Sequence, residues 1–313
     1  MLSRTADSLF WMGRYMERAG NLARGMQVAQ RMAGMGQALR GEVDEWQSLL
    51  VAAGAEPSFR AADQPATTEA VTRWLAVAPE NPSSIVSCIE SARRNGRAVR
   101  TALTVDMWEA LNDTWREMRA QAPSATEDDR LPAFLDWVRT RTLLFNGAAV
   151  DTMLRNDGWR FVHLGTMLER ADNTARLLDA KHPALSGPGS EGASAYAQWQ
   201  ALLRCVSALR AYNWVYHARL QPRLVADLLI YRKELPRSLL ACLDRVAHEL
   251  DMIAAANGGA QGECHRLVGR MLAELRFGQI EETLEDGLHA FLTRMIDRNE
   301  ELGRLIGEAY LTV

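Results

Sequence analysis

The sequence predicts an all-α protein of about twelve helices, and three observations support this fold class. No stretch shows the sustained alternation of apolar and polar residues that is typical of half-buried strands. Residues 13–24 contain no proline, and the steps of four and three between Glu17, Asn21 and Arg24 fit one face of a helix. The same pattern returns at residues 165–176, where seven of the twelve positions are identical, against about one expected from composition.

An internal duplication extends over nearly the whole chain. The two copies of the motif are 169 − 17 = 152 residues apart, and further matches follow at offsets that grow slowly to 157, as small loop insertions would produce. The matched segments are residues 46–50 with 199–203, 71–82 with 225–236, 84–89 with 238–243, and 133–135 with 290–292. We therefore predict two tandem pseudo-repeats of about 155 residues, at 1–155 and 156–313, packed as one bundle-like helical domain.

Glycine, proline and capping residues divide the first unit into six expected helices. Pro79 ends the third helix, and Ser84, which follows Pro82, is a favourable N-cap for the fourth. Pro132 begins the sixth helix after a polar loop at residues 121–130. The expected helices span residues 6–33, a segment centred on Trp46, 71–77, 84–103, 106–119 and 132–154.

The second unit follows the same course as the first. Prolines again mark two helix starts, at Pro222 and Pro236. The expected helices span residues 159–180, 196–217, 222–231, 236–256, 263–276 and 280–311.

One face of the opening helix mixes charged residues with small ones. At about 100° per residue, Glu17 shares a face with Arg14, Asn21 and Arg24, and glycines and alanines lie between them. A solvated face has no need of small residues among its charges, so we expect a helix or a ligand to approach this face closely. A charge that such an approach buries has to be paired.

Three interpretations of this face remain open. Exposed Arg–Glu pairs along the helix would contribute only about 0.2–0.5 kcal/mol each. A structural polar network would instead bind the two copies of the motif to each other, and a ligand site is the third interpretation. The residues of the predicted network are Glu17, Arg18, Asn21, Arg24, Glu169, Arg170, Asn173 and Arg176.

Positions that differ in charge between the two units are candidates for ligand binding. The counterparts of Arg93, Asn95 and Arg97 carry no positive charge, and guanidinium groups clustered on one helix face suit carboxylate or phosphate oxygens. The alternative is a solvated basic face, or one whose arginines pair with Glu90 and Glu109. The predicted ligand-binding residues are Arg4, Arg14, Arg93, Asn95 and Arg97.

Composition favours a soluble, cytoplasmic protein. The 313 residues are 48% hydrophobic, and 36 Lys and Arg are balanced by 39 Asp and Glu, which argues against a general nucleic-acid binder. Charged residues interrupt every apolar run in residues 1–30, so neither a signal peptide nor a membrane partner is expected. The histidines and cysteines form no known ligand spacing, so no metal and no other cofactor is predicted.

The sequence resembles the bacterial alpha-E domain family, an all-helical family named for a recurring Glu-Arg motif. The resemblance rests on short motifs along nearly the whole chain: Met1-Leu2-Ser3-Arg4, Gly13-Arg14-Tyr15, Glu17-Arg18-Ala19, Pro82-Ser83-Ser84-Ile85, Ala92-Arg93, Met107-Trp108-Glu109, Leu111-Asn112, Leu164-Gly165, Leu168-Glu169-Arg170-Ala171-Asp172, Thr174-Ala175-Arg176 and Pro236-Arg237-Ser238. The resemblance implies that the protein is a partner of a circularly permuted ATP-grasp ligase. Transglutaminase-like and proteasome-like proteins often accompany members of this family.

The resemblance leads to three hypotheses about function. The first is an accessory or binding subunit of a cytosolic system that forms peptide or amide bonds, partnered by the ATP-grasp ligase and by transglutaminase-like proteins. The second is an amide-forming or amide-cleaving transferase, with Glu17 or Glu169 as candidate catalytic bases in a polar bundle core. The third is a purely structural scaffold.

Overall fold

The computed structural model describes residues 3–35, 44–127, 129–181 and 192–311. All regular secondary structure in these ranges is helical, with α-helices and two short 3₁₀-helices and no strand. The prediction of an all-α fold is therefore confirmed. Within the same ranges, every helix is too short or too polar to cross a bilayer.

The helices of residues 1–155 follow most of the predicted segments. Their bounds are α1 Ser3–Ala33, α3 Glu45–Ala52, α4 Glu56–Ala61, α5 Thr68–Ala76, α6 Ile85–Ala98, α7 Val105–Gln121 and α8 Arg130–Thr152. Ser84 caps α6 as predicted, because its hydroxyl accepts a hydrogen bond from the backbone N–H of Ser87 at 3.2 Å. A 3₁₀ turn at Arg100–Ala102 follows α6.

The helices of residues 156–313 include one, α14, that a serine caps in the same way as Ser84 caps α6. Their bounds are α9 Asp157–Lys181, α11 Ala193–Cys205, α12 Leu209–Tyr216, α13 Pro222–Tyr231, α14 Leu239–Ala256, α15 Glu263–Phe277, α16 Ile280–Glu285 and α17 Leu288–Tyr310. Ser238 caps α14 by accepting from the backbone N–H of Ala241 at 3.0 Å, and like Ser84 it is fully buried.

Three features depart from the predicted segments. The sequence does not predict α4, whose Pro57 occupies the first turn, where a proline is tolerated. The expected helix 196–217 is interrupted at Ser207, which has a φ of 58° in the left-handed region. The expected helix 280–311 is divided in the same way at Gly287, with a φ of 101°. The predicted continuity was wrong at both breaks, because one residue's backbone conformation ends a helix whose apolar pattern continues.

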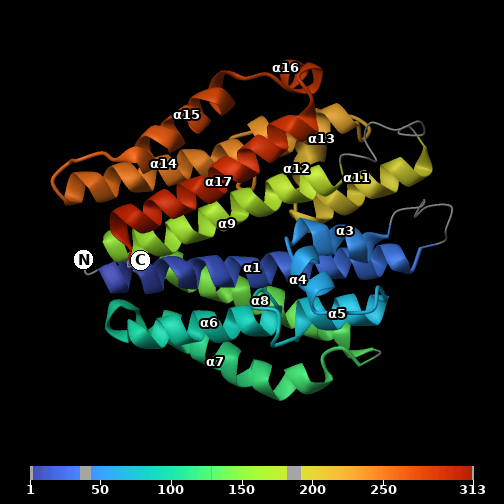
Figure 1. Cartoon of the computed structure of the whole chain (residues 1–313), viewed down its shortest axis with the longest axis horizontal. Coiled ribbons are helices and arrows are strands. Elements are labelled where there is room, and N and C mark those ends of the chain that lie inside the picture. The colour runs from blue at the N-terminus through green and yellow to red at the C-terminus, as the bar shows by residue number, and fades with distance from the viewer. Residues whose placement is uncertain (1–2, 36–43, 128, 182–191, 312–313) are drawn as a thin grey trace.

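Helices α1 and α9 lie side by side through the middle of the molecule (Figure 1). Helices α6 and α8 pack against α1, while α14 and α17 pack against α9. The two outer groups therefore lie on opposite sides of the central pair (Figure 1). This arrangement brings the two copies of the Glu-Arg motif together. The pseudo-repeat itself stays a prediction.

Apolar side chains fill the space on both sides of the central pair. One buried cluster joins the first half of α1, including the fully buried Met12, to Leu164 of α9 and to helices α14 and α17. A second joins the later part of α1, including Met26, to α3, α5, α6 and α8. Burying one such side chain contributes about 1.5–3 kcal/mol, so the first cluster stabilises the packing of α1 with α9, and the second stabilises the packing of α1 with the helices that follow it.

Candidate functional site

The two central helices meet backbone to backbone at a pair of glycines. A Cβ atom added to Gly13 would lie 2.2 Å from the carbonyl oxygen of Val162, and one added to Gly165 would lie 2.0 Å from the carbonyl oxygen of Phe10. Neither position has room for a side chain. The close approach brings polar side chains one turn further along each helix within reach of the other helix.

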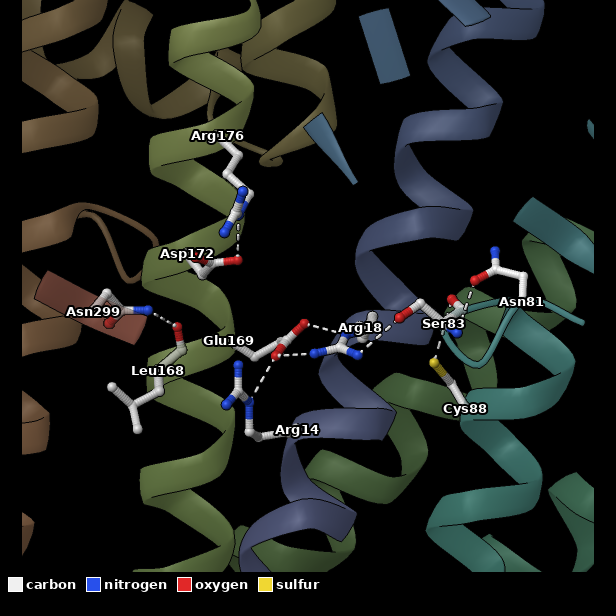
Figure 2. A network of polar contacts seen from close by, with 10 residues as sticks. All are labelled: Arg14, Arg18, Asn81, Ser83, Cys88, Leu168, Glu169, Asp172, Arg176 and Asn299. Atoms are coloured by element: carbon white, nitrogen blue, oxygen red, sulfur yellow. Dashed lines mark hydrogen bonds and ion pairs between the residues drawn. The ribbon is translucent and has the colours of Figure 1, made fainter. Parts of the chain in front are cut away.

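The two Glu-Arg dipeptides form ion pairs that cross between the helices. Glu169 of α9 accepts hydrogen bonds from Arg18 of α1, at 2.5 Å from Nε and 3.0 Å from Nη2 (Figure 2). In the reverse direction, Glu17 of α1 accepts from Arg170 of α9, at 2.9 Å from Nη2 and 3.3 Å from Nε. Each glutamate thus binds the arginine that follows the other glutamate. Both contacts are bidentate on the arginine side, the geometry that fixes orientation best.

Further arginines surround both carboxylates. Arg14 donates its Nε to Glu169 at 2.9 Å. Arg237, which directly precedes the cap of α14, donates to Glu17 at 2.6 Å. Arg24 lies 3.5 Å from the same carboxylate. The glutamates are buried, with 2% of Glu17 and 5% of Glu169 exposed, so the charge of each is compensated by arginines in a water-poor environment.

These arginines set the acidity of both glutamates. Burial alone raises the pKa of Glu17, but the charges of Arg170, Arg237 and Arg24 outweigh it, so the pKa lies well below its usual range. Burial likewise raises the pKa of Glu169, and Arg18 and Arg14 reverse that effect and lower the pKa to about 2. Both carboxylates therefore remain ionised at neutral pH, and both are weak bases.

A pocket of about 300 Å³ opens beside Glu169. Three guanidinium groups and three carboxylates line it, which gives a mixed and balanced set of charges. The charged lining residues are Arg14, Arg18, Arg176, Glu169, Asp172 and Glu300, and the uncharged polar ones include Asn21, Asn173 and Ser83. Arg18 holds one wall in place by donating to the hydroxyl of Ser83 at 3.0 Å (Figure 2).

Several polar atoms of the lining residues have no hydrogen-bond partner among the described residues. They are Oδ1 of Asp172 and the Nδ2 groups of Asn21 and Asn173. The other oxygen of Asp172 accepts from Arg176 Nε at 2.8 Å (Figure 2). Burial is the main cause that raises the pKa of Asp172, and nearby Glu169 adds to it. An added cation would therefore stabilise this carboxylate, and an added acceptor would satisfy the two amides.

Five of the eight predicted network residues line this pocket. Arg170 and Arg24 complete the network on its far side, through Glu17, and Arg24 also donates to Asn21. The network members that line the pocket are Arg18, Asn21, Glu169, Asn173 and Arg176, and Glu17 is one turn before Asn21.

The predicted ligand-binding residues do not come together. Of the five, Arg14 lines the pocket and the other four lie outside its lining. Arg93 lies over the ring of Trp115, 4.0 Å from its centroid, and Arg4 and Arg97 are exposed. Arg93 contacts Trp115 and Asn112 of α7, and Arg97 is exposed, so neither shares the lining of the pocket with Arg14.

Sequence reasoning missed four residues of the site. Asp172 and Glu300 supply charge to the pocket, Ser83 anchors Arg18, and Arg237 binds Glu17. One signal was present: Ser83 and Arg237 occupy matching places directly before the helix caps Ser84 and Ser238. The position of α17 beside α9, which brings in Glu300, depends on tertiary packing and has no local signal.

Comparison with known proteins agrees with the resemblance. A family model described as "a predicted alpha-helical domain with a conserved ER motif" matches residues 1–311. In this chain the Glu-Arg dipeptide occurs at residues 17–18 and 169–170, the four residues of the crossed ion pairs.

Curated relatives match the chain over most of its length. An uncharacterised protein of Mycobacterium bovis (strain ATCC BAA-935 / AF2122/97) is 28% identical over an alignment of 313 positions. The alignment covers 94% of this chain and 35% of the relative. An uncharacterised protein of Mycobacterium tuberculosis (strain ATCC 25618 / H37Rv) is 27% identical over the same shares. The chain thus spans about a third of the length of these relatives, and no solved structure matches it significantly. With its match over residues 1–311, the chain belongs to the Alpha-E family.

Proposed function

We propose that this chain is the accessory, substrate-holding part of a cytosolic system that forms peptide or amide bonds. Its partner in this proposal is a circularly permuted ATP-grasp ligase, with transglutaminase-like proteins as further partners. The pocket beside Glu169 holds a small zwitterion, an amino acid or short peptide, which is the kind of molecule that such a ligase joins.

The charge pattern of the pocket carries the proposal. Arg14 and Arg18 pair with Glu169, and Arg176 pairs with Asp172 and Glu300, along the lining of a space of about 300 Å³, which is large enough for a small molecule of several heavy atoms. A ligand with one ammonium and one carboxylate group matches such a lining better than an anion or a cation alone.

In this proposal, buried atoms of the lining residues that lack a hydrogen-bond partner bind the two ends of the ligand. Oδ1 of Asp172 is a free acceptor for an ammonium group, and the raised pKa of this carboxyl reflects an environment that favours an added positive charge. The Nδ2 groups of Asn21 and Asn173 are free donors for a carboxylate. Charge-assisted hydrogen bonds of this kind contribute about 1.5–3 kcal/mol each.

The length of the relatives supports an accessory role. This chain covers 35% of the Mycobacterium proteins it matches, so there the domain is one part of a longer chain. A domain that works beside other domains is an expected arrangement for a subunit that presents substrate to an enzyme.

The acidity of the glutamates disfavours the alternative of a catalytic base. The pKa of Glu169 is lowered to about 2 and that of Glu17 lies well below its usual range, whereas an efficient general base has a pKa near the working pH. Arginines occupy both carboxylates, so neither is positioned to take a proton from a substrate.

The zwitterion claim is tested by calorimetric titration of the full chain with free amino acids and dipeptides. The same compounds with an acetylated amino group or an amidated carboxyl group form the comparison. We expect binding that weakens about tenfold or more when either end is blocked. Binding of the acetylated compounds as tightly as the free ones would contradict the proposal, as would no binding by any compound.

A pocket variant separates this site from the rest of the surface. Asn173→Ala removes an amide whose Nδ2 makes no hydrogen bond with the described residues, so it leaves the fold intact and weakens binding. Asn213→Ala, on the exposed side of α12, is the matched control and leaves binding unchanged. The same pair of variants, titrated against the ATP-grasp ligase with and without ATP and Mg²⁺, tests whether the pocket matters for the partnership.

A further inference from the structure

A second pocket, of about 430 Å³, lies at the C-terminal half of α1 and is lined by five arginines. They are Arg24 and Arg31 of α1, Arg139 of α8, Arg204 of α11 and Arg210 of α12. The break at Ser207 allows the end of α11 and the start of α12 to contribute to the same pocket. No carboxylate is among the described residues that line it.

Nearby carboxylates compensate only part of this charge. Asp136 accepts from Arg139 at 3.1 Å and from Gln27 at 2.7 Å, at the exposed edge of α8. Glu17 lies 3.5 Å from Arg24, but it is shared with Arg170 and Arg237.

No carboxylate of the described residues compensates the charges of the other three arginines of this pocket. Arg31, Arg204 and Arg210 are exposed and form no ion pair with any residue in the described ranges. At least three guanidinium charges therefore face one space without a carboxylate partner.

Arg24 is the buried member of the group. Only 9% of the surface of Arg24 is exposed, and its Nε has no hydrogen-bond partner among the described residues. Burial and the charge of Arg237 are the main causes that lower the pKa of Arg24, to about 9, although Glu17 acts in the opposite direction. A guanidinium in this position is under-compensated, and an anion in the pocket would stabilise it.

We infer that this pocket binds a small multivalent oxyanion through several arginines at once. Planar guanidinium groups donate pairs of parallel N–H bonds to phosphate or carboxylate oxygens, and five such groups around one space favour a ligand with two or more negative charges. The volume accommodates a pyrophosphate or a tricarboxylate with its hydration water. The inference is independent of the proposed function, because none of these residues lines the pocket beside Glu169.

Calorimetric titration of the full chain with pyrophosphate, and separately with citrate, tests the inference at physiological chloride concentration. Binding of pyrophosphate alone identifies phosphate groups as the ligand chemistry, and binding of citrate alone identifies carboxylates. Binding of both supports a general site for multivalent oxyanions. Binding of neither overturns the inference.

Two exposed arginines allow the site to be located without unfolding the protein. Arg204→Gln combined with Arg210→Gln removes two donors that make no ion pair with the described residues, so the fold is preserved, and the dissociation constant rises about tenfold or more. The matched control combines Arg219→Gln with Arg270→Gln, two exposed arginines outside the pocket, with the same change in net charge. An equal loss of affinity in both double variants would overturn the inference, since it would reflect net charge alone, and unchanged affinity in the first would also overturn it.

Discussion

Arg170 of α9 donates two hydrogen bonds to Glu17 of α1. Reciprocally, Arg18 of α1 donates two hydrogen bonds to Glu169 of α9. The relationship gives the Glu-Arg motif a physical meaning. Glutamate and arginine are neighbours in sequence but bind partners on the other helix, so each motif supplies one half of each ion pair. Two motifs, placed by the glycine contact one turn away, satisfy each other.

Removal of one carboxylate from the crossed pairs will strongly destabilise the fold. Glu17→Gln leaves the buried Arg24 and the partly buried Arg170 and Arg237 without their carboxylate, and we expect a loss of about 3–5 kcal/mol in the free energy of unfolding, measured by urea denaturation. The control Glu90→Gln changes an exposed carboxylate on α6 and should stay within about 0.5 kcal/mol. Equal stability of the two variants would disprove the buried network.

The glycine contact will not accept a methyl group. Gly165→Ala places a Cβ atom 2.0 Å from the carbonyl oxygen of Phe10, so the helices have to separate, and unfolding should become easier by about 3 kcal/mol or more. Gly147→Ala, in α8, meets no atom within 4 Å and should instead stabilise by up to about 1 kcal/mol. Thermal melts of both variants check the prediction, and a Gly165→Ala protein as stable as the parent would refute the close approach.

Acid will weaken the crossed pairs in a defined pH range. The pKa of Glu169 is lowered from 4.5 to about 2, and a carboxyl with a lowered pKa contributes stability above its unfolded-state pKa and loses that contribution as the pH falls through its folded-state pKa. The stability contributed by Glu169 should therefore decline between about pH 4.5 and pH 2. Urea denaturation across this range, compared with Glu169→Gln, checks it, because the variant should lose part of the pH dependence. An identical pH profile in the variant would count against the lowered pKa.

A glycine at the end of α12 will stabilise the protein slightly. His217 is the C-cap, with a φ of 49° in the left-handed region that costs a non-glycine residue about 1 kcal/mol. His217→Gly should therefore raise stability by up to about that amount in chemical denaturation. His248→Gly, inside α14, should lower it, because glycine disfavours a helix interior. A destabilised His217→Gly variant would show that its side chain contributes more than the backbone conformation costs.

The sequence was most informative where both copies of the motif agree. The repetition of Glu17, Asn21 and Arg24 at Glu169, Asn173 and Arg176 predicted a buried network, because small residues among charges imply a close neighbour. In the structure Glu17 and Glu169 each pair with an arginine of the other helix, and Arg24 lies 3.5 Å from Glu17. Asn21, Asn173 and Arg176 line the pocket beside Glu169. Their role in ligand binding and the internal duplication both stay predictions.

Inference from differences between the two halves was less successful. The basic face of Arg93 and Arg97 differs in charge from its counterpart, but Arg93 packs on Trp115, a contact that charge patterns cannot indicate. The five-arginine pocket escaped detection for a related reason. Arg24, Arg139 and Arg204 are far apart in the sequence, and only the tertiary fold gathers them around one space.

A double-mutant cycle on Arg18 and Glu169 tests the central claim most directly, because it isolates the contact between the two helices. Arg18→Gln, Glu169→Gln and the double variant are compared with the parent in urea denaturation. The crossed ion pair predicts that the double variant loses less stability than the sum of the single losses, with a coupling of about 1–3 kcal/mol. Losses that add within about 0.5 kcal/mol would contradict a direct Glu-Arg pairing between α1 and α9.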